Sequence, residues 1–168
     1  MESRPDASSM RPFRRAATVA CLALLAAAGA PLTAVDPARD VVGEGDDPVA
    51  ERIRIRLEAS GRPLRTAATG ATTHAGTALP DFYERRVFRP AWSREGRVRP
   101  AADSLLAALA AADREGLRPE DYHLATVRAL RRRVSEAGGR AEADALAELD
   151  LLLTDAFLTY AVHLADGR

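Results

Sequence analysis

The sequence predicts an all-α protein of about five helices in a small irregular bundle, preceded by a signal peptide and a flexible linker. Two observations predict this class. Only 5% of the residues are aromatic, while alanine and leucine abound, a composition typical of packed helices rather than of a β-sandwich. Apolar residues also recur at helical spacing along the chain, and no segment predicts a convincing strand.

The longest periodic segment, residues 141–168, is predicted to be the central helix, with Gly167 as its C-terminal stop. Its wide apolar stripe holds Leu146, Leu149, Leu153, Ala156, Phe157, Tyr160 and Leu164. A second, narrower strip holds Leu151, Leu158 and Val162. A helix with two apolar faces needs neighbours on both sides. We therefore expect the narrow strip either to pack against a neighbour or to form an interface, and in the second case to be an exposed apolar patch in the isolated chain.

Shorter helices are predicted where proline, glycine and N-cap signals flank other periodic segments. They cover residues 48–59, 80–90, 100–116 and 124–138, with a single turn opened by Pro119 between the last two. Residues 66–77 contain no large side chain and predict an exposed connection in which His74 is solvated.

Residues 1–34 have the layout of a secretory signal peptide: arginines, an apolar run and an Ala-Gly-Ala end. The apolar run is short and rich in alanine for a membrane span. We therefore expect a periplasmic protein, with an uncleaved membrane anchor as the alternative. Residues 35–47 predict the linker, and residues 48–168 the folded domain.

Charge and cysteine content argue against several functions. The 24 basic residues, all arginine, and the 24 acidic residues cancel to a net charge of 0, so nucleic acid is not an expected partner, and a membrane only through the signal peptide. Cys21, the single cysteine, lies in the signal segment, which leaves no thiol nucleophile in the mature chain. The three histidines lack metal-site spacing, so we expect neither a metal nor a cofactor.

No catalytic residue is predicted. Asp150 and Asp155 diverge by roughly 140° around the helix, so we expect Asp150 to make a structural hydrogen bond and Asp155 to lie at a surface or partner contact. His123, at a helix start, is expected to cap or pack. His163 shares a side of the last helix with Thr159 and, more loosely, with Asp155, so a polar network among these three residues is one hypothesis. A hydrolase built on the two aspartates and His163 is the least favoured hypothesis, because it lacks a nucleophile.

Four of the eight aromatic residues lie between Phe82 and Trp92. Phe82, Tyr83 and Trp92 are interpreted as core residues, because large aromatics in a small helical domain are usually buried. The alternative is a binding surface formed with the neighbouring arginines, Arg85, Arg86 and Arg89.

Three segments stand out in order: LPDFYERRVFRPAW, AADSLLAALAAADREGLRPEDYHL and AELDLLLTDAFLTYAVHLADGR. Together they resemble the N-terminal scaffold region of the large periplasmic L,D-transpeptidases of the YcbB type, over residues 51–168. The positions that match the family's motifs are Phe82, Tyr83, Pro90, Trp92, Gly116, Leu117, Pro119, Asp121, Tyr122, His123, residues 149–155, Tyr160, Gly167 and Arg168.

The resemblance implies an enzyme that forms 3→3 peptidoglycan cross-links through a cysteine acyl-enzyme. The family's catalytic motif, a histidine followed by Ser-x-Gly-Cys, does not occur in this sequence, so no catalytic residue carries over. The chain is expected to be a truncated scaffold part whose partner is the missing catalytic domain, in cis, and which meets stem peptides through that domain. The alternative is a stand-alone periplasmic helical module that binds peptidoglycan or a partner protein.

Overall fold

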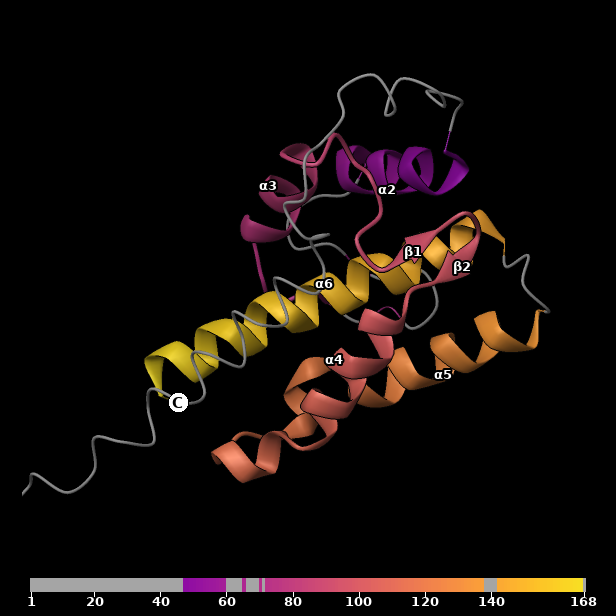
Figure 1. The fold of residues 1–168 in the computed structure, drawn as a ribbon. Coiled ribbons are helices and arrows are strands. Elements are labelled where there is room, and N and C mark those ends of the chain that lie inside the picture. The colour runs from indigo at the N-terminus through magenta and orange to yellow at the C-terminus, as the bar shows by residue number, and fades with distance from the viewer. Residues whose placement is uncertain (1–46, 60–64, 66–69, 71, 138–141, 168) are drawn as a thin grey trace, which may run out of the picture.

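The computed structural model describes residues 47–59, 65, 70, 72–137 and 142–167. Its α-helices are α2 (Pro48–Ala59), α3 (Ala78–Glu84), α4 (Pro100–Ala110), α5 (Leu124–Glu136) and α6 (Ala143–Asp166) (Figure 1). The 3-10 helices η2 (Ala112–Glu115) and η3 (Pro119–Tyr122) join α4 to α5. The predicted all-α class is therefore confirmed for the described part of the chain.

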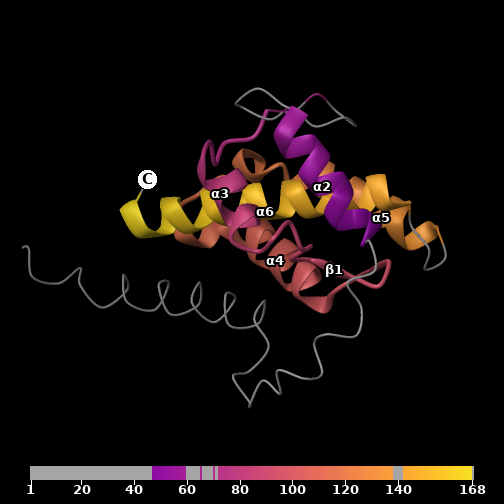
Figure 2. The same cartoon turned by 90° about the horizontal axis from the view of Figure 1, so that it is seen from above.

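Helix α6 lies at the centre of the domain, and the other helices pack on two sides of it. Figures 1 and 2 show α2 and α3 on one side and α4 and α5 on the other, and α6 contacts all four as well as η3. Every residue from Leu146 to Phe157 is buried. The prediction that this helix needs neighbours on both sides is confirmed.

The narrow apolar strip is not an open face along its whole length. Leu151 is only 2% exposed and belongs to the core, so the expectation that it awaits a partner is wrong. Leu158 is half-buried and packs against the core, whereas Val162 is 55% exposed. The flanking helices cover the middle of α6, and only the strip's C-terminal end reaches solvent.

Helix α3 ends at Glu84, whereas the sequence predicted a helix that continues to Pro90. The backbone NH of Phe88 donates to the carbonyl of Tyr83 at 2.8 Å, and both Val87 and Phe88 adopt positive φ angles, 53° and 58°. This left-handed turn exposes Val87 to solvent. The sequence offered no glycine to mark such a turn.

A small hairpin follows Trp92 where no strand was predicted. Strands β1 (Ser93–Arg94) and β2 (Arg97–Val98) pair antiparallel. The turn between them has positive φ at Glu95 and Gly96, 54° and 75°, which matches the conformation of a two-residue hairpin turn. Two-residue strands are too short for periodicity to reveal them.

The predicted helix over residues 100–116 is divided into two parts. Helix α4 ends at Ala110, and the chain tightens into η2 before Gly116, whose φ is 75°. His123, also at a positive φ of 53°, occupies the N-cap position of α5 but makes no side-chain capping bond. The predicted signal peptide and nearly all of the linker lie outside the described residues, among which no helix is long and apolar enough to cross a membrane.

Ile53 and Ile55 offer a matched test of how α2 packs on α6. Ile53 is fully buried and Ile55 is 43% exposed. Replacing Ile53 with alanine should lower the free energy of unfolding by about 2–4 kcal/mol, because it leaves a cavity in the core. The same replacement at Ile55 should cost less than about 1 kcal/mol. Urea unfolding of the two variants measures both values, and equal losses would contradict this packing.

Candidate functional site

The most extensive polar arrangement in the core surrounds the Asp150 carboxylate of α6, which is 1% exposed. Its Oδ1 accepts hydrogen bonds from the Ala91 backbone NH at 2.7 Å and the Tyr83 hydroxyl at 2.8 Å. Its Oδ2 accepts from the Trp92 backbone NH at 3.0 Å and the Ser93 hydroxyl at 3.1 Å. One side chain of α6 therefore holds both α3 and the segment that follows it.

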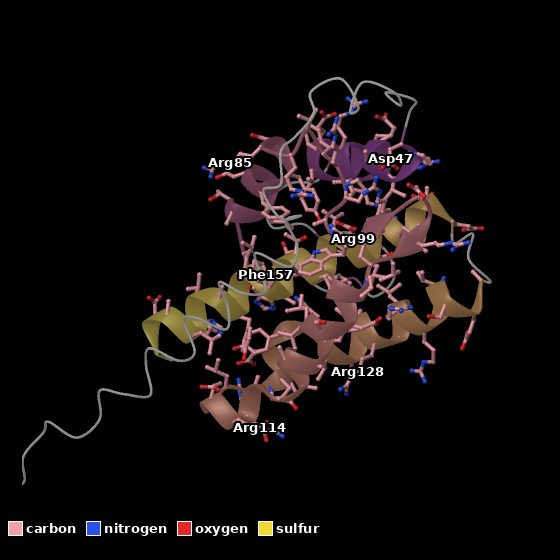
Figure 3. All side chains as sticks on the ribbon, viewed as in Figure 1. Asp47, Arg85, Arg99, Arg114, Arg128 and Phe157 are labelled. Atoms are coloured by element: carbon pink, nitrogen blue, oxygen red, sulfur yellow. The ribbon has the colours of Figure 1, made fainter. Side chains whose placement is uncertain are left out.

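Thr154, one turn further along α6, extends this arrangement. Its hydroxyl donates to the Asp150 backbone carbonyl at 2.9 Å and accepts from the Trp92 indole NH at 2.9 Å. The Tyr83 hydroxyl lies 2.7 Å from the same oxygen. The Trp92 ring also packs edge-on against the ring of Phe157, with 5.9 Å between the two ring centroids. Phe157 belongs to α6 and is labelled in Figure 3.

Burial raises the pKa of Asp150 from 3.8 to about 6. The hydrogen bonds from Ala91, Tyr83, Trp92 and Ser93 oppose this shift, because they stabilise the charged carboxylate. Burial also raises the pKa of the Tyr83 hydroxyl well above its ordinary value, and the nearby Asp150 charge adds to that effect. Tyr83 therefore stays protonated and acts as a hydrogen-bond donor.

The structure places the predicted aromatic residues mainly in the core. Tyr83 is fully buried and Trp92 is 2% exposed, while Phe82 is half-buried and packs at the edge of the core. The expectation that Asp150 makes a structural hydrogen bond is confirmed. Sequence reasoning missed the backbone donors at Ala91 and Trp92, since only the fold brings them to α6.

The second aspartate of α6 was expected at a surface or partner contact, and that expectation is wrong. Asp155 is fully buried. Its Oδ1 accepts from the backbone NH groups of His74 and Ala75, at 2.9 and 2.7 Å, and its Oδ2 lies 3.1 Å from His123 Nε2. The described part of the predicted exposed loop is thus tied to α6, and Thr73 within it is only 5% exposed.

The histidines take part in packing and hydrogen bonding. The rings of His74 and His123 lie 4.8 Å apart between centroids, and His163 Nδ1 lies 2.9 Å from the Tyr122 hydroxyl. The network expected between His163, Thr159 and Asp155 does not form, since the buried Thr159 hydroxyl has no hydrogen-bond partner among the described residues.

The arrangement favours structural roles over acid–base chemistry. Each buried aspartate is occupied by donors from the chain itself: four groups on Asp150, and two backbone NH groups and a histidine on Asp155. In the part of the chain that the structure describes, no three His, Cys, Asp or Glu side chains are placed to hold a metal ion. The two carboxylates fasten separate segments, residues 83–93 and 73–75, onto one helix.

Asp150 and Asp144 provide a matched pair on α6. Asp150→Ala removes the acceptor of two buried backbone NH groups and two hydroxyls, so the free energy of unfolding should fall by about 3 kcal/mol or more. Asp144 is exposed and pairs with Arg52 and Arg56 at the surface. Asp144→Ala should therefore cost less than about 1 kcal/mol, and a similarly small loss for Asp150→Ala in urea unfolding would contradict the assignment.

The raised pKa of Asp150 also makes the stability of the fold depend on pH. The folded carboxyl binds its proton more tightly than the unfolded one, so its contribution favours folding below about pH 4 and is lost as pH rises through about 6. Over this pH range the free energy of unfolding should fall by roughly 3 kcal/mol. A ¹³C NMR titration of the Asp150 carboxyl should show a midpoint near 6, and a midpoint at or below 4 would contradict the effect of burial.

Comparison with known proteins adds one match. The family model described as "Scaffold domain" matches residues 77–168, which span all three segments singled out in the sequence, together with Tyr83, Trp92, Asp150 and Asp155. No curated protein and no solved structure matches the chain significantly. Because the family model covers more than half of the chain, this protein belongs to the Scaffold domain family.

Proposed function

We propose that this chain is the scaffold portion of an exported L,D-transpeptidase that forms 3→3 peptidoglycan cross-links, and that the chain itself is non-catalytic. The family match over residues 77–168 carries the proposal, together with the resemblance of the three segments to scaffold regions of YcbB-type enzymes. In this proposal the reacting groups lie on a catalytic domain joined in cis, which also supplies the contact with stem peptides.

The buried carboxylates support a scaffold role. Asp150 and Asp155 fix two connecting segments onto α6, which is how a small helical domain holds irregular surface segments in one conformation. The two hydroxyls that donate to Asp150, those of Tyr83 and Ser93, are buried in the core and are not placed as accessible nucleophiles for acyl transfer. These features suit a rigid support better than a reaction centre.

The alternative, a stand-alone module that binds peptidoglycan through an aromatic surface, has less support. Glycan-binding aromatic residues present an exposed ring face, whereas Trp92 is 2% exposed and its indole NH is already bonded to Thr154. A stand-alone module would need a different surface. The hydrolase hypothesis loses its basis, because Asp150, Asp155 and His163 bind to separate groups.

The reading frame of the source gene beyond the Arg168 codon tests the proposal directly. We expect the frame to continue into a domain that holds a histidine followed by Ser-x-Gly-Cys. The full enzyme should then form 3→3 cross-linked muropeptide dimers, measured by mass spectrometry of digested peptidoglycan. Asp150→Ala should reduce these dimers and Asp144→Ala should not.

A stop codon directly after Arg168 would contradict the proposal. So would a continuing frame that lacks the cysteine motif. In the first case, co-sedimentation of the purified chain with peptidoglycan would favour the stand-alone module.

A further inference from the structure

The turn after α3, residues 85–89, is held in a strained conformation, and we call it the Val87 turn. Val87 and Phe88 are consecutive non-glycine residues at positive φ, 53° and 58°. A β-branched residue in the left-handed region is a conformational outlier, because its Cβ substituents crowd the backbone. Asparagine or glycine would fit this position without strain, so valine is present at a cost to stability.

The strained turn exposes an apolar side chain to solvent. Val87 is 75% exposed, more than either of the other large exposed apolar residues among those described, Ile55 at 43% and Val162 at 55%. Its neighbour Phe88 packs against the core and anchors the turn. The protein therefore holds one valine outward on a fixed backbone.

Arginines flank this valine in the sequence. Residues 84–99 contain six arginines and two glutamates. Arg86 stabilises the turn, since its guanidinium donates to the carbonyls of Arg89 and Pro90, each at 3.3 Å, and its Cζ lies 5.4 Å from the centre of the Phe82 ring.

Arg85 and Arg89 are placed differently from those arginines of the described surface that pair with carboxylates. Arg52, Arg54, Arg56, Arg118 and Arg131 each lie in an ion pair with a carboxylate. No carboxylate among the described residues pairs with Arg85 or Arg89, and both residues are exposed. Figure 3 shows Arg85 at the periphery of the domain.

We propose that the Val87 turn is a docking point for an acidic polypeptide segment. Arg85 and Arg89 would receive its carboxylates, and Val87 would contact an apolar side chain between them. Arginine forks match carboxylates in geometry as well as in charge, and exclusion of water by an apolar neighbour strengthens such pairs. A single valine offers too little apolar area to anchor a bilayer, so a peptide fits this surface better than a lipid.

This inference rests on the proposed function in one respect only, namely that a scaffold holds another protein. It does not depend on the cross-linking chemistry. Its test needs no second domain, so its failure and a failure of the reading-frame test are distinguishable.

The experiment titrates the full chain into a fluorescein-labelled peptide of glutamates with one central leucine and follows fluorescence anisotropy. Replacing both Arg85 and Arg89 with glutamate should weaken binding by at least about tenfold. Val87→Asn removes the apolar tip but tolerates positive φ, so it should weaken binding about threefold or more while thermal unfolding stays at or above the wild-type midpoint.

The matched control replaces Arg128 and Arg132, exposed residues of α5, with glutamate; Figure 3 shows Arg85 and Arg128 on opposite sides of the domain. This variant carries the same charge change and should bind the peptide within about twofold of wild type. The proposal is overturned if no binding occurs, if both double variants lose affinity equally, or if a glutamine version of the peptide binds as well. It is also overturned if anionic phospholipid vesicles, and not the peptide, bind in a Val87-dependent manner.

Discussion

The fold of this domain depends on a buried carboxylate in the middle of its longest helix. Asp150 lies on α6 among leucines, where an unpaired charge would be costly. It is tolerated because two backbone NH groups and two hydroxyls of residues 83–93 donate to it. The same bonds give acceptors to the backbone NH groups of Ala91 and Trp92, which lie in the irregular segment between α3 and β1. The Asp150 carboxylate thus accepts hydrogen bonds from backbone NH groups that hydrophobic packing alone would leave without acceptors.

Several other features follow from that anchor. With Ala91 and Trp92 held on α6, the Trp92 ring lies against Phe157 and Thr154, and the β1–β2 hairpin starts from a fixed point. The strained turn at Val87 and Phe88 lies between two anchored points, Tyr83 and Ala91. Strain persists only where the surroundings over-determine the backbone, and these two contacts provide that constraint.

Sequence reasoning predicted the features of the fold that local sequence patterns control. Periodicity, proline and glycine signals gave the all-α class, the bounds of α2, and a central helix with neighbours on both sides. It failed where tertiary contacts decide the outcome. Asp155 looked peripheral because its partners, the backbone of residues 74 and 75 and the His123 ring, are distant in sequence. The turn at Val87 was invisible because a β-branched residue there violates the preference that prediction relies on.

The central claim is that the Asp150 carboxylate holds residues 91 and 92 as firmly as the core holds α6. Native-state hydrogen exchange of the Ala91 and Trp92 amides tests this claim most directly. We expect both amides to exchange only through global unfolding, with the same opening free energy as the buried amides of α6. Exchange at a much lower opening free energy, while α6 stays protected, would show that the carboxylate does not anchor this segment and would contradict the account.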